Sequence, residues 1–185
     1  MNETAAPLRA VLLDRDGTLV VDVPYNGDPG LVRPMPGARS AVERLRGAGL
    51  RLGVVSNQSG IGRGLLTEEQ VDAVDARVRE LLGPFDVWMR CPHTAEAGCG
   101  CRKPQPGLVL AACAALDILP SEAVVVGDIG ADVGAATTAG SASVLVPTPA
   151  TRPEEIAAAP RVAADLDEAA RLILADAAPT AGSAA

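Results

Sequence analysis

The sequence predicts an α/β fold, a three-layer doubly wound parallel sheet of the Rossmannoid kind. Short apolar runs rich in Val and Leu alternate along the chain with segments of helical pattern, as in βαβ units. The 185 residues are 48% hydrophobic but include only one Trp, one Tyr and one Phe. The core should therefore consist of aliphatic side chains, as is typical of buried parallel strands flanked by Ala-rich helices.

Five apolar runs are expected to form the strands, and the segments between and after them the helices. The strands are expected at residues 9–13, 51–56, 85–90, 121–128 and 141–146, with a further short strand at 161–164. The helices are expected at residues 37–48, 68–82, 104–119, 132–140 and 167–177. The chain length suits one core, so we expect a single domain over residues 1–178 and a disordered tail at 179–185.

The ends of the expected helices are marked by residues with known preferences. Gly49 follows the first helix, and Gly83 with Pro84 follows the second, which are typical stop signals. Thr67 and Gln70 form a capping box at the start of the second helix. A proline near its start supports the third helix.

Charge and hydropathy exclude two classes of partner. The formal net charge is −7, whereas a nucleic-acid binder needs clustered Lys and Arg to displace counterions. No apolar run approaches the roughly 18 residues of a membrane span, and the N-terminus has no signal-peptide pattern. We therefore expect a cytoplasmic protein with neither nucleic acid nor membrane as a partner. We also expect a monomer.

Polar residues follow the strands at one edge of the predicted sheet, where ligands bind in open parallel sheets. These residues are Asp14, Asp16, Ser56, Asn57, Lys103 and Asp128. In DRDGT, one carboxylate can attack an electrophile while the other handles a proton. Asp-Gly is also a common turn signal, so this motif alone allows a purely structural interpretation.

Asp128 and Asp132 in VVVGDIGAD add carboxylates to the same edge. Three or more carboxylates repel one another unless a cation joins them, and oxygen ligands of this kind suit Mg²⁺. The structural alternative is that either residue caps the helix at 132–140, and Asp132 could do both. Ser56, Lys103 and a divalent cation would form a positive cradle for a phosphoryl group. Individually, Ser56 and Lys103 also fit a loop residue and a surface lysine.

Three of the four cysteines and the only histidine lie within CPHTAEAGCGC. Cys91, His93, Cys99 and Cys101 have the number and softness of ligands that suit tetrahedral Zn²⁺. Because four protein ligands close the coordination shell, this zinc would be structural. The alternatives are a structural histidine with scattered thiols, or a redox pair, which lacks the C-x-x-C spacing here.

DRDGT, SNQSG, CRKP and GDIGAD together resemble the four ordered motifs of the haloacid dehalogenase superfamily of phosphatases, over about residues 11–140. The segment CPH…CGCRKPQPG is similar to the zinc loop, here residues 91–103, of D-glycero-D-manno-heptose 1,7-bisphosphate 7-phosphatases and histidinol phosphatases. The spacing of the motifs leaves no room for an inserted lid, so a capless enzyme with a zinc-binding loop is expected.

The resemblance implies a role for each motif residue. Asp14 would be the nucleophile that forms an aspartyl-phosphate, and Asp16 the general acid and base. Mg²⁺ would be held by the side chains of Asp14 and Asp128 and the carbonyl oxygen of Asp16. Ser56 and Lys103 would bind the phosphoryl oxygens, and Asp132 would orient Lys103 or the water shell of the metal.

The resemblance also implies substrate contacts. Arg102 matches a position associated with substrate recognition, and Arg63 is a candidate for a second phosphate, although an exposed arginine between glycines fits equally. The substrate-contacting loops match Asp22, Tyr25, Asn57, Gln58 and Ser59. Ile129 is a departure, because the heptose enzymes usually carry a polar residue after the fourth-motif Asp.

The expected activity is Mg²⁺-dependent hydrolysis of a phosphomonoester, with the 7-phosphate of D-glycero-D-manno-heptose 1,7-bisphosphate as the leading candidate. Histidinol phosphate or another small phosphomonoester is the alternative within the enzyme class. From another class, the chain could be a zinc-stabilised binding module whose catalytic site has decayed. The presence of Asp14, Asp16, Lys103 and Asp128 together counts against decay.

Overall fold

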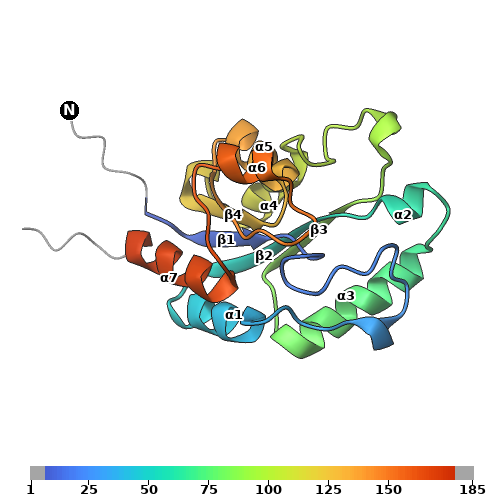
Figure 1. Ribbon diagram of the computed structural model, residues 1–185, viewed down its shortest axis with the longest axis horizontal. Coiled ribbons are helices and arrows are strands. Elements are labelled where there is room, and N and C mark those ends of the chain that lie inside the picture. The colour runs from blue at the N-terminus through green and yellow to red at the C-terminus, as the bar shows by residue number, and fades with distance from the viewer. Residues whose placement is uncertain (1–6, 178–185) are drawn as a thin grey trace, which may run out of the picture.

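The computed structural model describes residues 7–177, which form a five-stranded parallel sheet between two layers of helices (Figure 1). The strands are β1 (Ala10–Leu13), β2 (Arg51–Asn57), β3 (Val87–Cys91), β4 (Ala123–Gly127) and β5 (Ala142–Leu145). Their order across the sheet is β3-β2-β1-β4-β5, with every neighbouring pair parallel. After β1 the chain adds β2 and β3 on one side of β1 and then β4 and β5 on the other side. This order confirms the doubly wound prediction.

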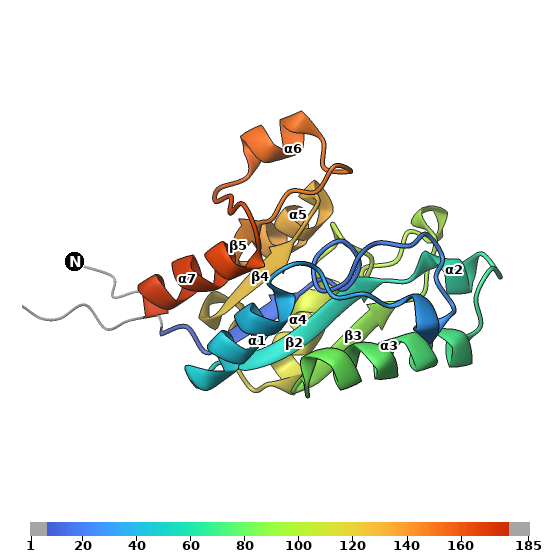
Figure 2. The same ribbon diagram turned by 60° about the horizontal axis from the view of Figure 1, so that its bottom comes forward.

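Seven α-helices occur in the part of the chain that the structure describes. They are α1 (Ala38–Gly47), α2 (Ser59–Gly62), α3 (Glu68–Leu82), α4 (Gly107–Ala115), α5 (Gly130–Ala139), α6 (Pro153–Ala158) and α7 (Leu166–Ala177). Short 3₁₀ turns lie at Pro29–Leu31, Ala95–Ala97 and Pro120–Glu122. Figure 2 shows α7 alongside α1, which it contacts, and shows α6 standing outside the two helical layers.

The core has two halves because the sheet is covered on both faces. Along β1, Val11 and Leu13 point into the half that α1, α3 and α7 cover, whereas Ala10 and Leu12 point into the half under α4 and α5. This alternation is the period of two expected for a strand, and all four residues are buried because both faces are covered.

Local sequence signals account for the helix that follows β2. The Thr67 side chain accepts a hydrogen bond from the Gln70 backbone N–H, and the Gln70 side chain accepts one from Thr67 N–H. This reciprocal pair satisfies donors that the first turn of α3 leaves free. Gly83 ends the helix with a φ of 89°, a conformation that favours glycine. The predicted capping box and stop signal are both confirmed.

The helix predicted at 104–119 is shorter in the structure, where α4 has only nine residues. Pro104 and Pro106 disfavour helical backbone in the residue that precedes each, so the chain remains a turn until after Pro106. At the other end, Asp117 adopts a left-handed conformation with a φ of 52°, which an α-helix does not accommodate.

Smaller differences concern the boundaries and two short helices. β2 extends one residue further than predicted to include Asn57, and α5 begins two residues earlier, at Gly130. The short strand predicted at 161–164 reduces to one parallel bridge between Val162 and Leu145. Neither α2 nor α6 was predicted, although a proline at the first position of α6 was a start signal.

The carboxyl edge of the sheet carries no inserted domain. Between β1 and α1 the chain forms a loop with one 3₁₀ turn, and between β2 and α3 it forms only α2 and short loops. The capless prediction therefore holds for residues 7–177. In the same range, no helix combines the length and apolar character needed to cross a membrane. The tail predicted to be disordered, 179–185, lies outside the described residues, and the single domain over 1–178 stays a prediction.

Candidate active site

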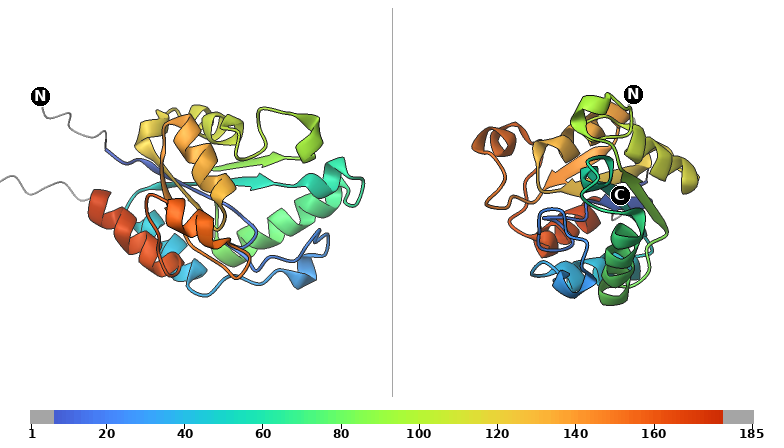
Figure 3. Two further views of the ribbon diagram at one scale, coloured as in Figure 1. Left: turned by 45° about the horizontal axis from the view of Figure 1, so that its top comes forward. Right: turned by 90° about the vertical axis from the view of Figure 1, so that its right-hand side faces the viewer.

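The polar residues predicted at the carboxyl edge of the sheet do come together there. The loop after β1 brings Asp14 beside β4, where its N–H donates to Val126 O at 2.9 Å. Ser56 ends the buried part of β2, Asp128 directly follows β4, and Lys103 comes from the loop after β3. Figure 3 (left) shows this loop, in yellow-green, at the end of the molecule toward which the arrowheads of β2 and β3 point.

Lys103 is the centre of this group and the only lysine of the chain. Its Nζ donates to Asp14 Oδ1 at 2.6 Å, to Asp132 Oδ1 at 2.6 Å and to Val55 O at 2.7 Å. The side chain is buried, and these three acceptors use all three of its donors. The predicted contact between Asp132 and Lys103 is therefore present.

Electrostatics keep Lys103 charged in this buried position. Burial alone would lower the pKa of the ammonium, but the charges of Asp132 and Asp14 outweigh it and raise the pKa. Asn57 fixes the backbone of the same residue, because its Oδ1 accepts from Lys103 N–H and its Nδ2 donates to Lys103 O, both at 3.1 Å. Asn57 was predicted in a substrate-contacting loop, but its amide is occupied with Lys103.

Asp14, Asp128 and Asp132 each offer a carboxylate oxygen, and these oxygens lie within 4.8 Å of one another. Burial, followed by the charge of Asp132, raises the pKa of Asp128 from 3.8 to about 7. Burial also raises the pKa of Asp14, although Lys103 opposes this. Three buried carboxylates with a single ammonium among them make a site short of positive charge, and such an oxygen-rich donor set fits Mg²⁺.

One glycine and two threonines surround Asp128. Gly17, with a φ of 80°, passes so close that a Cβ there would overlap the Asp128 carboxylate. Thr151 Oγ1 donates to Asp128 O at 2.6 Å, and Thr148 Oγ1 lies 3.4 Å from Asp128 Oδ2. These threonines precede α6, so the segment after β5 holds Asp128 in place.

The raised pKa of Asp128 predicts a pH dependence in protein desalted free of Mg²⁺. Because the folded-state pKa exceeds the unfolded-state value, the stabilisation is fully present below about pH 4 and is lost as the pH rises to about 7. The free energy of unfolding should fall by up to about 1.4 kcal/mol per pH unit relative to an Asp128→Asn variant. Urea denaturation of both proteins at pH 5, 6 and 7 measures this difference, and a constant difference would contradict the assignment.

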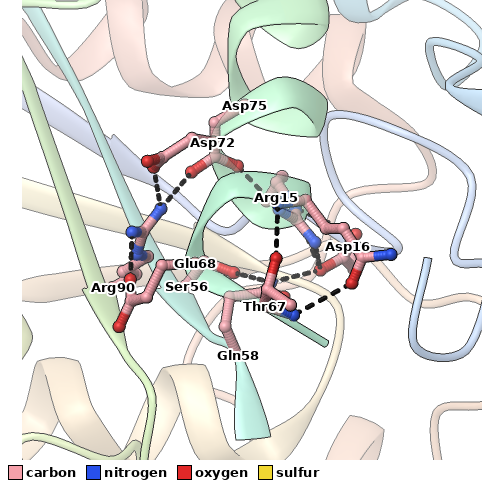
Figure 4. Close-up of polar contacts among 10 residues, drawn as sticks. Arg15, Asp16, Ser56, Gln58, Thr67, Glu68, Asp72, Asp75 and Arg90 are labelled. Atoms are coloured by element: carbon pink, nitrogen blue, oxygen red, sulfur yellow. Dashed lines mark hydrogen bonds and ion pairs between the residues drawn. The ribbon is translucent and has the colours of Figure 1, made fainter. Parts of the chain in front are cut away.

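Asp16 is held by side chains on two sides (Figure 4). Arg15 Nε lies 3.1 Å from both of its carboxylate oxygens, and Arg15 Nη2 donates to Asp16 Oδ2 at 2.9 Å. Gln58 Nε2 donates to the same Oδ2 and to Ser56 Oγ, both at 2.8 Å. Gln58 was predicted among the substrate contacts, but its buried amide joins Asp16 to Ser56.

Cys91, His93, Cys99 and Cys101 gather around one point. Cys101 Sγ lies 3.1 Å from Cys91 Sγ, 3.4 Å from Cys99 Sγ and 3.3 Å from His93 Nδ1. Cys91 Sγ is 3.6 Å from Cys99 Sγ and 3.5 Å from His93 Nδ1, and no disulfide forms among the cysteines. The four donor atoms face one another as the ligands of one tetrahedral ion do, and the donor set fits Zn²⁺.

The same loop presents Arg102 beside a cavity of about 370 Å³. The cavity is lined by Ala95, Gly98, Cys99, Gly100, Arg102, Lys103, Pro104 and Gln105. Arg102 Nη1 makes one long contact, 3.4 Å, with His93 O. This leaves most of the guanidinium donors of Arg102 available next to the lysine that contacts Asp14.

The remaining predicted substrate residues lie around the loops near this edge. Asp22 is exposed, and its pKa is raised by partial burial and then by the charge of Asp16. Tyr25 is half-exposed with its ring against Gly60 in α2, and Ser59 is the first residue of that helix. Arg63 follows α2 and, like Arg102, is one of the charges that lower the pKa of Glu96, after hydrogen bonds within residues 94–96. The backbone next to Arg63 contacts the Cys/His loop, because Gly62 N–H donates to Pro92 O at 2.9 Å.

Four contributors to the site were missed from the sequence, namely Arg15, Asp75, Thr148 and Thr151. Arg15 stands between the two aspartates of DRDGT. Its guanidinium can be buried because it pairs with Asp75, which lies sixty residues away in the sequence. Thr151 carries no motif that would have identified it. For Arg15, the position inside the motif was the one available signal.

This chain is similar to several known proteins. A family model described as HAD-hydrolase-like matches residues 100–169. The D-glycero-beta-D-manno-heptose-1,7-bisphosphate 7-phosphatase of Pseudomonas putida is 35% identical over 150 residues, which are 76% of this chain and 83% of the relative. The enzyme of the same name from Vibrio cholerae is 39% identical over 142 residues, covering 71% of this chain and 76% of that protein.

A solved structure shares the fold over nearly the whole chain. The crystal structure of D,D-heptose 1,7-bisphosphate phosphatase from Bordetella bronchiseptica, complexed with magnesium and phosphate, superimposes with a TM-score of 0.82 and 30% identity. The match covers 91% of this chain and 99% of that one.

Proposed function

Because this chain belongs to the haloacid dehalogenase-like hydrolases, among the heptose-bisphosphate phosphatases, we propose that it removes the 7-phosphate of D-glycero-D-manno-heptose 1,7-bisphosphate. The observation that carries the proposal is the contact of Lys103 with Asp14 and Asp132 beside Asp128. It combines a carboxylate nucleophile, a cation and a set of metal-binding oxygens at one edge of the sheet.

Asp14 is the nucleophile in this proposal. One of its carboxylate oxygens forms a bond to phosphorus while the bond from phosphorus to the sugar oxygen breaks. Water then attacks the aspartyl-phosphate at phosphorus and releases inorganic phosphate and the free carboxylate. Lys103 and Ser56 bind the phosphoryl oxygens, which requires the Lys103 ammonium to exchange part of its present contacts for them.

Asp16 handles the protons. It donates a proton to the leaving sugar alkoxide in the first step and takes one from the attacking water in the second. Its side chain is one-quarter exposed, so a substrate and a water molecule can both reach it. The bonds from Arg15 and Gln58 fix its direction relative to Ser56.

The side chains of Asp14 and Asp128 and the carbonyl oxygen of Asp16 would hold Mg²⁺, and Asp132 would act through Lys103. When bound, Mg²⁺ neutralises charge on the phosphoryl oxygens during transfer. Thr148 and Thr151 orient Asp128, and Gly17 leaves the room that this carboxylate needs.

Cys91, His93, Cys99 and Cys101 would hold one structural Zn²⁺, which orders the loop that carries Arg102 and Lys103. Zinc binding would then stabilise the ordered conformation of this loop, because thiolates brought so close together repel one another without a metal. We also propose that the protein acts as a monomer in the cytoplasm on this small sugar phosphate.

Loss of a zinc ligand should loosen the site without touching its carboxylates. A Cys99→Ser variant is expected to fall clearly below the content of about one zinc per chain and to lose activity. Metal analysis of the desalted protein with a parallel phosphate-release assay measures both quantities. Cys113→Ala is the matched control, since that buried thiol lies outside the cluster. Equal zinc content in Cys99→Ser and wild type would refute the ligand assignment.

A substrate screen tests the proposed function. Mg²⁺-dependent phosphate release is measured with heptose 1,7-bisphosphate, histidinol phosphate and hexose bisphosphates, and kcat/KM should be highest for the heptose ester. Ile129, more than one-third exposed beside Asp128, stands where the resemblance implies a polar residue, so it bears on substrate preference. A preference for histidinol phosphate would overturn the heptose assignment, and the absence of activity on every ester would overturn the phosphatase assignment.

A further inference from the structure

We propose that Arg15, anchored by Asp75 of α3, is a positioning residue that fixes the general acid and base Asp16. The inference rests on the proposed function and adds to it two residues that lie outside the metal and phosphoryl contacts. Arg15 acts through Asp16, and Asp75 acts through Arg15. Neither residue is proposed to touch the substrate.

Arg15 is among the most completely buried side chains of the protein, with 2% of its surface exposed. Its guanidinium uses one edge, Nε and Nη2, for Asp16 and its remaining nitrogen, Nη1, for Asp75 Oδ1 at 2.6 Å. A guanidinium is planar, so a bond on one edge sets the direction of the other. The contact with Asp75 therefore fixes the orientation of the Arg15 guanidinium, and the guanidinium in turn fixes the orientation of the Asp16 carboxylate.

Asp75 is itself held in a rigid place. Its side chain is 3% exposed on α3, and its second oxygen, Oδ2, lies 3.5 Å from Arg90 Nη1 on β3. Arg90 also pairs with Glu68 and Asp72 of α3 (Figure 4). The chain of ion pairs thus ties the loop of DRDGT to a helix and to a strand at the edge of the sheet.

The buried ion pair of Arg15 and Asp75 is an inefficient way to stabilise the fold, because its desolvation costs free energy. Placing a guanidinium and a carboxylate in the interior removes both from water, and hydrophobic side chains of similar volume are often as stabilising. A positioning role explains why this pair lies next to Asp16. General acid–base catalysis requires the proton donor to be held within about 0.5 Å of its productive place.

Gln58 supplies the second point of attachment. Its Nε2 lies between Asp16 Oδ2 and Ser56 Oγ, 2.8 Å from each. With Arg15 on one side and Gln58 on the other, the carboxylate of Asp16 cannot rotate without breaking a hydrogen bond. Loss of the Arg15 fork leaves Asp16 attached only through Gln58.

Arg15→Lys and Asp75→Asn test the inference. Lysine keeps the charge but cannot donate in the planar fork, and asparagine at position 75 leaves the catalytic loop untouched while it removes the anchoring charge. The measured quantity is kcat/KM, which reports on the first chemical step, for a sugar phosphate and for p-nitrophenyl phosphate. A sugar alkoxide needs a proton in order to leave, whereas p-nitrophenolate leaves without one.

For Arg15→Lys we expect kcat/KM to fall by about 10- to 100-fold with the sugar phosphate and by less than about threefold with p-nitrophenyl phosphate. Asp75→Asn should show a smaller loss with the same selectivity. Asp176→Asn is the matched control, because it makes the same change at an exposed carboxylate of α7 whose partner, Arg161, lies outside this chain of ion pairs, and both rates should stay unchanged.

The two possible failures are distinguishable. If wild type hydrolyses both esters and the two variants lose equal factors with both, or lose nothing, the positioning role is refuted. A smaller folded fraction would produce such an equal loss. If wild type hydrolyses neither ester with Mg²⁺, the proposed function itself fails.

Discussion

An Asp14→Asn variant is expected to release phosphate at least about 10³-fold more slowly than wild type, at every concentration of Mg²⁺ and substrate. An amide oxygen is a poor nucleophile toward phosphorus, so the covalent step stops. The substitution also removes one of the three carboxylate oxygens grouped at the metal site. The loss should appear in kcat, since Ser56, Lys103 and Arg102 remain available to bind the substrate.

The same variant should fold normally. Burial opposes the charge of Asp14 by raising its pKa, and Lys103 keeps its ion pair with Asp132 when the charge at position 14 is removed. Asparagine has the same shape and still offers Lys103 an oxygen acceptor. The denaturation midpoint of Asp14→Asn should therefore equal or exceed that of wild type without Mg²⁺, which separates lost chemistry from lost structure. A rate equal to that of wild type would disprove the mechanism.

A Lys103→Met variant is expected to lose both activity and stability. Methionine has a similar length but leaves Asp14 and Asp132 buried without their shared cation. Breaking a buried ion pair in this way costs about 3–5 kcal/mol of unfolding free energy. The loss should shrink as the pH is lowered from 8 to 5, because the carboxyl group of Asp14, whose pKa burial raises, is then protonated in the folded variant.

Urea denaturation at pH 8 and pH 5 in protein free of Mg²⁺ measures this effect. Arg171→Met is the matched control, since within residues 7–177 Arg171 pairs only with the partly exposed Asp167 on α7, and its loss should cost less than about 1 kcal/mol. A Lys103→Met variant as stable as this control at pH 8 would contradict the role of Lys103 as the counter-ion of the site.

The sequence predicted that the polar residues of the site meet at one edge of the sheet, because parallel strands bring their carboxyl ends together. Asp14 and Asp128 each follow a fully apolar run, so the ends of β1 and β4 could be identified without a structure. The grouping of the Cys/His ligands could likewise be predicted from their spacing, since all four lie within eleven residues and a segment that short can bring them together in a single loop. Both inferences depend on local pattern and on one topological rule.

Contacts that depend on side-chain direction were not predictable in this way. Asn57 and Gln58 belong to a loop that resembles a substrate-contacting one, but their amides turn inward to Lys103 and Asp16. The pair of Arg15 with Asp75 joins residues sixty positions apart, and no period or motif connects them. Such pairs form only when α3 packs against the loop after β1, and the local sequence does not reveal this tertiary contact.

The start of α4 was predicted three residues too early, at Pro104 instead of Gly107. The apolar pattern of residues 104–119 is helical, and a proline near the start is a common first-turn residue. A second proline two residues later restricts the residue before it, so the turn continues to Pro106. This turn keeps Lys103 outside the helix, where Asn57 binds its backbone and its side chain reaches Asp14.

The most direct test of the account is whether Asp14 becomes phosphorylated during turnover. Wild-type protein hydrolysing a sugar phosphate with Mg²⁺ is quenched in acid, digested and analysed by peptide mass spectrometry. The account predicts one added phosphoryl group on Asp14 that is absent in the Asp14→Asn variant and without substrate. Continued hydrolysis with no phosphoryl group on Asp14, or with the group on another residue, would contradict it.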